Sequence, residues 1–175
     1  LGPNGTIAVG NAGTGGTLAT IGRYVRYCRH ATQVCGADAE HSVFFDHYLS
    51  RDPALALERG SRIEGIGRPR VEPSFLPGIL DAAVKVPDAL SIGAIRWLER
   101  VLGRRCGGST GTNFVATLHL AARMHAAGEA GSIVTVLCDG GERYRHSFYD
   151  DAWVRSKGID LAAAVEAVAA WAGRG

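Results

Sequence analysis

Short apolar runs alternate along the chain with longer segments of helical periodicity. The apolar runs cover residues 6–9, 32–37, 83–86 and 132–137. Helical patterns cover residues 17–29, 41–49, 87–102, 112–127 and 161–172. Because parallel strands are joined by crossover connections that usually contain a helix, this alternation predicts an α/β fold. We expect a three-layer arrangement, a parallel sheet with helices on both faces.

Two connecting segments have no clear periodicity. Residues 52–60 are polar and composed of residues that tolerate a helix, and residues 62–77 are rich in Gly and Pro and predict an extended loop. No repeat, low-complexity segment or linker divides the chain. We therefore expect residues 1–175 to form a single α/β domain.

Composition and charge limit the classes of partner that the protein is expected to bind. The 175 residues are 46% hydrophobic and carry a net charge of only +2, which is too small to predict a nucleic-acid partner. Arg23, Arg26 and Arg29 form a basic stretch that is typical of a solvated helix face. The sequence has no membrane-length apolar run, and its first five residues do not resemble a signal peptide. We therefore expect a cytoplasmic protein without a membrane partner.

Cysteines and histidines are scattered without ligand spacing. The four cysteines contain no C-x-x-C pair, so neither a disulfide framework nor a zinc site is predicted, and buried free thiols are expected. His119 and His125 are spaced by six residues, and His30, His41 and His47 form no ligand pattern. The sequence therefore predicts no metal site.

A glycine-rich turn follows the first apolar run. Gly13-Thr14-Gly15-Gly16-Thr17 ends a predicted strand and opens a helix, where backbone N–H groups at the positive end of the helix dipole can bind a phosphate. A dinucleotide fingerprint is excluded because Leu18 stands where its third glycine would be, and a P-loop is excluded because no Gly-Lys follows. A tight strand-to-helix turn without a ligand is the alternative.

Three further glycine-containing segments follow the glycine turn along the chain. They are Ile63-Glu64-Gly65-Ile66-Gly67, Gly107-Gly108-Ser109-Thr110-Gly111 and Gly141-Glu142-Arg143-Tyr144. Together with the glycine turn, they resemble the fold-type-II pyridoxal-phosphate enzymes of the cysteine synthase and cystathionine β-synthase family. The resemblance covers nearly the whole chain, and Cys138-Asp139-Gly140-Gly141 is most similar to a cysteine desulfhydrase-like branch.

The resemblance implies a cofactor and roles for particular residues. It implies that Gly13, Thr14, Gly15, Gly16 and Thr17 bind the phosphate of pyridoxal 5'-phosphate. It also implies that Ser109 hydrogen-bonds the pyridine nitrogen and that Gly65 lies beside the cofactor. The implied activity is β-elimination or β-replacement at cysteine, O-acetylserine or a similar L-amino acid, with cysteine desulfhydration favoured. The implied assembly is a homodimer.

The Schiff-base lysine of the family is missing from its expected place. In the family this lysine precedes the glycine turn, whereas the two lysines here, Lys85 and Lys157, follow it and match no lysine motif. We therefore expect the C-terminal part of a longer enzyme, without a catalytic residue of its own. A non-catalytic phosphate-binding module or pseudo-enzyme is the alternative.

A different reaction class is also compatible with one motif. Gly107-Gly108-Ser109-Thr110-Gly111 fits the G-x-S-x-G pattern of α/β-hydrolases, and Asp139 and His146 follow in the required order. However, Asp139 and His146 are only seven residues apart, whereas the acid and base of that fold follow different strands. The hydrolase hypothesis also leaves the first glycine turn unexplained.

Overall fold

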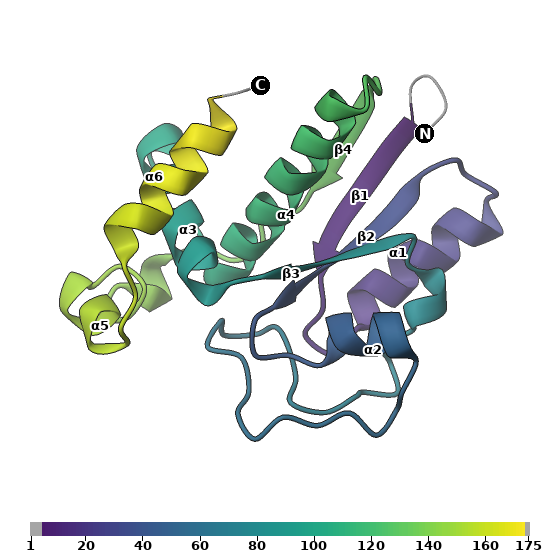
Figure 1. Ribbon diagram of the computed structural model, residues 1–175, viewed down its shortest axis with the longest axis horizontal. Coiled ribbons are helices and arrows are strands. Elements are labelled where there is room, and N and C mark those ends of the chain that lie inside the picture. Colours follow the sequence, from purple (N-terminus) through teal and green to yellow (C-terminus); the bar gives the residue numbers. More distant parts are fainter. Residues whose placement is uncertain (1–4, 174–175) are drawn as a thin grey trace.

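The fold is built on a parallel sheet of four strands. The computed structural model describes residues 5–173, so the first four residues, on which the expectation about a signal peptide partly rests, lie outside it. The strands are β1 (Gly5–Asn11), β2 (Gln33–Ala39), β3 (Ala82–Val86) and β4 (Gly131–Thr135). Their order is β3-β2-β1-β4 with every pair parallel (Figure 1).

Helices cover both faces of this sheet. Those of one face are α1 (Gly16–Tyr27) and α2 (Phe44–Ser50). Those of the other face are α3 (Asp88–Leu102), α4 (Gly108–Ala126) and α6 (Leu161–Ala172), of which α4 lies against the sheet and α6 packs on α3. The shorter elements are α5 (Asp151–Ser156) and two 3₁₀ turns at Pro77–Ile79 and Glu142–Tyr144.

Successive side chains of β2 pack into two different layers of the core. Cys35 is fully buried and packs in the cluster that includes Val115 of α4, whereas the neighbouring Val34 packs with Leu18 and Val25 of α1. Successive side chains of a strand point to opposite faces, so both faces of β2 are buried under helices. The predicted three-layer α/β arrangement is confirmed.

Two local expectations differ from the structure. Residues 52–60 contain no helix and instead form turns and a bridge between Ala56 and Arg70. The second glycine turn is not a loop, because α4 begins at Gly108 and not near residue 112. A Cβ at Gly111 would lie only 2.0 Å from the carbonyl oxygen of Ser91, so glycine there allows α4 to pack closely on α3.

The strand predicted at residues 132–137 exists but is an exposed edge. β4 ends at Thr135, and Val134, Val136 and Leu137 are 55%, 53% and 45% exposed. Apolar periodicity predicts a strand but does not report whether a neighbour covers it. Within residues 5–173, β4 thus has an edge without a pairing strand, and apolar side chains on and just after β4 are exposed.

The exposure of cysteine and arginine side chains agrees in part with the predictions from the sequence. All four cysteines are free, but Cys28 and Cys138 are exposed, so the expectation that the thiols are buried is correct only for Cys35 and Cys106. Arg23 and Arg26 on α1 and Arg29 just after it are exposed, and Arg26 pairs with Asp81 at 2.8 Å. Among residues 5–173, no helix is long and apolar enough to cross a membrane.

Candidate cofactor site

The first glycine turn joins β1 to α1 through a left-handed residue. Gly15 has φ 100° and ψ −13°, and its carbonyl oxygen accepts the first helical hydrogen bond from the Ala19 amide at 2.8 Å. A Cβ at Gly15 would lie 2.5 Å from the Cα of Phe75. Both the backbone angle and the packing of Phe75 therefore require glycine at this position.

The amino end of α1 is free to bind an anion. No side chain caps this helix, and its first turn carries no acidic residue. The first amides of a helix have no partner within the helix, and the helix dipole makes this end electropositive. The turn therefore offers the uncapped amides that a phosphate group requires.

A cavity of about 410 Å³ opens at this turn. Its walls include every residue from Gly13 to Thr17 together with Gly65 from the loop after α2. A Cβ at Gly13 would lie 2.6 Å from the Gly65 carbonyl oxygen, so the two loops are in direct contact. Two segments about fifty residues apart in the sequence thus form one site beyond the carboxyl end of β1.

Ser109 lies next to this cavity. It is 6% exposed and borders an adjoining hollow of about 260 Å³ that shares Asn11, Gly65 and Cys138 with the first cavity. Its hydroxyl has no hydrogen-bond partner in the described part of the chain and is available to a ligand. The predicted site residues are therefore contiguous.

Eight residues of the cavity wall were not predicted from the sequence, and four of these have side chains that can form hydrogen bonds. These four are Asn11, Arg68, Asn113 and Cys138. Asn11 Nδ2 donates to the Ser109 carbonyl oxygen at 3.1 Å and to Asn113 Oδ1 at 3.0 Å, which ties the two glycine segments together. The position of Asn11 at the end of a strand is a weak signal for such a role, but no local pattern indicates that Arg68 reaches a phosphate-sized cavity.

Both lysines lie away from the cavity. Lys85 on β3 pairs with Asp46 Oδ2 at 2.6 Å, and Lys157 at the end of α5 lies 5.4 Å from the centre of the Trp153 ring. Neither lysine contributes to the cavity wall. These contacts are those of ordinary structural lysines, in agreement with the absence of a lysine motif.

The residues of the hydrolase alternative do not form a triad. The Asp139 carboxylate accepts a hydrogen bond from the Tyr144 hydroxyl at 2.7 Å, and His146 is exposed. Burial and, secondarily, the Asp139 carboxylate raise the pKa of Tyr144, so this phenol remains a donor. In the described residues His146 has no hydrogen bond to Ser109 or Asp139, and Ser109 has no left-handed backbone angle. This geometry gives no support to acyl transfer.

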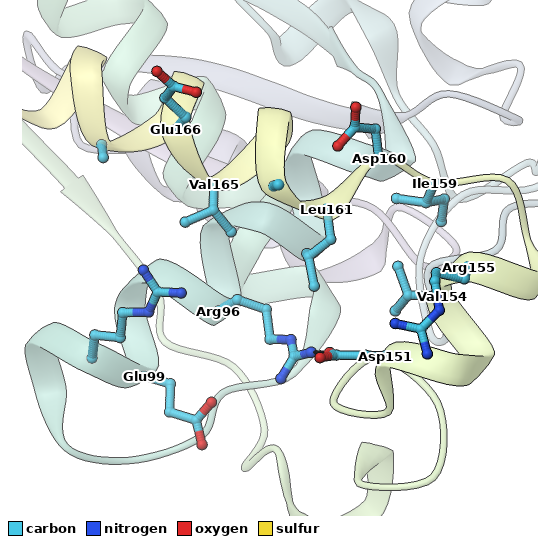
Figure 2. Close-up of a pocket in the computed structure, with 13 residues that line it drawn as sticks. Arg96, Glu99, Asp151, Val154, Arg155, Ile159, Asp160, Leu161, Val165 and Glu166 are labelled. Carbon is cyan, nitrogen blue, oxygen red and sulfur yellow. Dashed lines mark ion pairs between the residues drawn. The ribbon is translucent and has the colours of Figure 1, made fainter.

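A larger cavity of about 810 Å³ lies between α3, α5 and α6 (Figure 2). In it Arg96 of α3 points toward Asp151 of α5, with which it forms an ion pair. Burial lowers the pKa of Arg96, whose side chain is 17% exposed. The wall mixes charged side chains, three arginines among them, with apolar ones such as Val165, but none of the glycine-turn residues lines it. Size therefore does not identify the cofactor site.

Comparison with known proteins decides the family. The family model described as "Pyridoxal-phosphate dependent enzyme" matches residues 1–139, a range that contains the glycine turn, Gly65 and Ser109. The chain belongs to this family. Its cofactor is accordingly pyridoxal phosphate, as the resemblance of the motifs implies.

The names of several relatives within the family describe enzymes of cysteine metabolism. The chain is 55% identical over 156 residues to L-cysteine desulfhydrase Cds1 of Mycobacterium tuberculosis, covering 89% of this chain and 42% of that protein. It is 31% identical to cysteine synthase 2 of Schizosaccharomyces pombe, covering 86% of the chain and 40% of that protein. It is 29% identical to cystathionine beta-synthase of Apis mellifera, covering 86% of the chain and 29% of that protein. The chain thus spans less than half the length of these relatives.

Proposed function

We propose that this chain supplies the phosphate-binding and pyridine-binding walls of an enzyme that catalyses β-elimination or β-replacement at cysteine or an O-acetylserine-like L-amino acid. The observation that carries the proposal is the single site formed by Gly13 to Thr17, Gly65 and Ser109. The 55% identity to an L-cysteine desulfhydrase favours cysteine desulfhydration within this class.

Each part of the site has a distinct task. The amides at the start of α1 hold the phosphate, and the Thr14 and Thr17 hydroxyls add donors. Bound pyridoxal phosphate supplies electron withdrawal from the Cα of an attached amino acid. The Ser109 hydroxyl orients the pyridine nitrogen and, because it is neutral, does not stabilise the protonated form of that nitrogen as a carboxylate would. Gly65 leaves room for the amino acid beside the cofactor, since a side chain there would enter the shared wall.

The proposal also assigns the part of the catalytic centre that these residues do not supply. The Schiff-base lysine is assigned to a part of the protein outside these 175 residues, because Lys85 and Lys157 lie elsewhere and the relatives are more than twice as long. In this proposal residues 1–175 are the C-terminal part of the enzyme. The homodimer and the cytoplasmic location remain expectations of the resemblance and of the sequence composition.

The proposal is tested on the full-length protein in two steps. Borohydride reduction followed by peptide mass analysis is expected to find a pyridoxyl group on a lysine outside these 175 residues. Sulfide release from L-cysteine, compared with cysteine formation from O-acetylserine and sulfide, then separates elimination from replacement. A protein with no pyridoxyl group and neither activity would instead be a phosphate-binding pseudo-enzyme.

Substitutions at Ser109 test the assigned role. Ser109→Ala removes one hydrogen bond to the cofactor ring, so we expect kcat/KM to fall about tenfold, the effect of roughly 1.4 kcal/mol. Ser132→Ala, on the exposed strand β4, is the matched control and should leave kcat/KM unchanged. Equal kcat/KM in both variants would remove Ser109 from the site.

A further inference from the structure

A second polar cluster lies at the carboxyl ends of β2 and β3, outside the cofactor cavity. Glu40 and His41 directly follow β2, and Asp88, the first residue of α3, follows β3 after a single residue. One ligand atom from each of the three side chains lies within 4.8 Å of the others. Neighbouring parallel strands thus bring together residues that the sequence separates by nearly fifty positions.

Asp88 is the buried member of this cluster. Its side chain is only 3% exposed, and neither carboxylate oxygen has a hydrogen-bond partner in the described structure. A buried carboxylate without partners is costly, and native proteins usually supply donors or a cation. The Asp88 amide donates to Glu40 Oε2 at 3.1 Å, which holds a second carboxylate beside the first. The arrangement therefore places two carboxylates side by side.

The remaining contacts do not complete a hydrogen bond to the Asp88 carboxylate. His41 Nδ1 is also buried and unpartnered, and it lies 3.4 Å from Asp88 Oδ2, beyond the usual length of an N–H···O bond. By contrast, two ligand atoms of a tetrahedral Zn²⁺ are separated by roughly 3.3–3.6 Å, given metal distances of about 2.0–2.2 Å. The Arg62 Nε lies 4.0 Å from the same carboxylate oxygen and completes no hydrogen bond with it.

We propose that Glu40, His41 and Asp88 bind a divalent cation of the Zn²⁺ class. One imidazole and two carboxylates are a ligand set that suits Zn²⁺, and a water molecule completes four-coordination. Glu40 is exposed and His41 is half-buried, so they form an open side through which the ion enters, while Asp88 forms the floor.

Such an ion would link the cluster to the cofactor cavity. Ser42, the residue after His41, accepts a hydrogen bond through Oγ from the Arg68 amide at 3.2 Å. Arg68 lines the cavity of the glycine turn, and the neighbouring Gly67 amide donates to the Ala12 carbonyl oxygen at 2.8 Å. An ion that fixes the turn after β2 thus stabilises the loop that carries Gly65.

The test is a calorimetric titration of the chelator-treated, full-length protein with ZnCl₂. We expect one equivalent to bind and the melting temperature to rise with it. His41→Ala, a change at a solvent-accessible side chain, should weaken this binding tenfold or more, as should Asp88→Asn. The control His125→Ala alters an exposed histidine of α4 and should leave Kd unchanged. Arg62→Met should lower Kd, because it removes a neighbouring positive charge.

The result for His41→Ala is decisive, since Asp88→Asn could act through folding. Absence of a bound equivalent would overturn the proposal. Binding with the same Kd in His41→Ala would overturn it too, because the ion would then occupy another site such as the exposed thiols of Cys28 or Cys138. In either case His41, Arg62 and Asp88 form a charge cluster without a metal.

Discussion

Replacing Gly15 by alanine perturbs the phosphate turn in two ways. The left-handed backbone angle costs a non-glycine residue about 1–2 kcal/mol. In addition, the new Cβ would lie 2.5 Å from the Cα and 2.8 Å from the amide nitrogen of Phe75. These are backbone atoms that cannot rotate away, and overpacking of this kind typically costs about 1–3 kcal/mol.

The smaller conformational entropy of unfolded alanine offsets about 0.4–1 kcal/mol of this cost. We therefore expect Gly15→Ala to lower the free energy of unfolding by about 3 kcal/mol, which corresponds to a melting temperature lower by about 6–12 °C for a domain of this size. The same change displaces the start of α1. Pyridoxal phosphate binding should therefore weaken together with stability.

The matched control is the next residue, Gly16→Ala. At Gly16 the nearest atom to a new Cβ is the Thr14 hydroxyl at 4.0 Å, and the backbone is helical. Alanine is favoured over glycine in a helix by up to about 1 kcal/mol, so this variant should melt at an equal or higher temperature. The assays are thermal melting by circular dichroism and equilibrium dialysis of pyridoxal phosphate. Equal melting temperatures for the two variants would refute the reasoning.

Three further predictions concern the hydroxyl of a buried tyrosine, a helix contact and the sheet edge. Tyr149→Phe leaves the Cys106 amide and carbonyl without their partner at 2.9 and 2.8 Å, so urea unfolding should show a loss of about 1–3 kcal/mol. Burial raises the pKa of Tyr149 to about 12 from an ordinary value near 10. The stability linked to its protonated form is therefore complete below pH 10, falls as pH rises toward 12, and should not vary this way in Tyr149→Phe. Gly93→Ala places a Cβ 2.8 Å from the backbone of Ala164 and should separate α3 from α6, again at a cost of about 1–3 kcal/mol by urea unfolding. Val134→Lys puts a charge on the exposed edge of β4 and should reduce self-association of the isolated 175-residue chain in sedimentation; unchanged association would show that this edge is not the contact.

Local pattern in the sequence determined most of the elements. Periodicity predicts α6 at its observed bounds and places all four strands, because the spacing of apolar residues encodes which side of an element is buried. The Gly13 to Thr17 turn is also evident, since a phosphate needs only consecutive amides at one helix end. These features depend on neighbours in sequence.

The tertiary structure decided which distant residues meet. Asn11 reaches Ser109 across 98 positions because β1 lies at the centre of the sheet and α4 packs against it. The same strand order leaves β4 at an edge and brings His41 to Asp88, neither of which any local pattern reports. Strand order and helix packing depend on the burial of surface over the whole chain, so the sequence predicts the parts of the site while the fold assembles them.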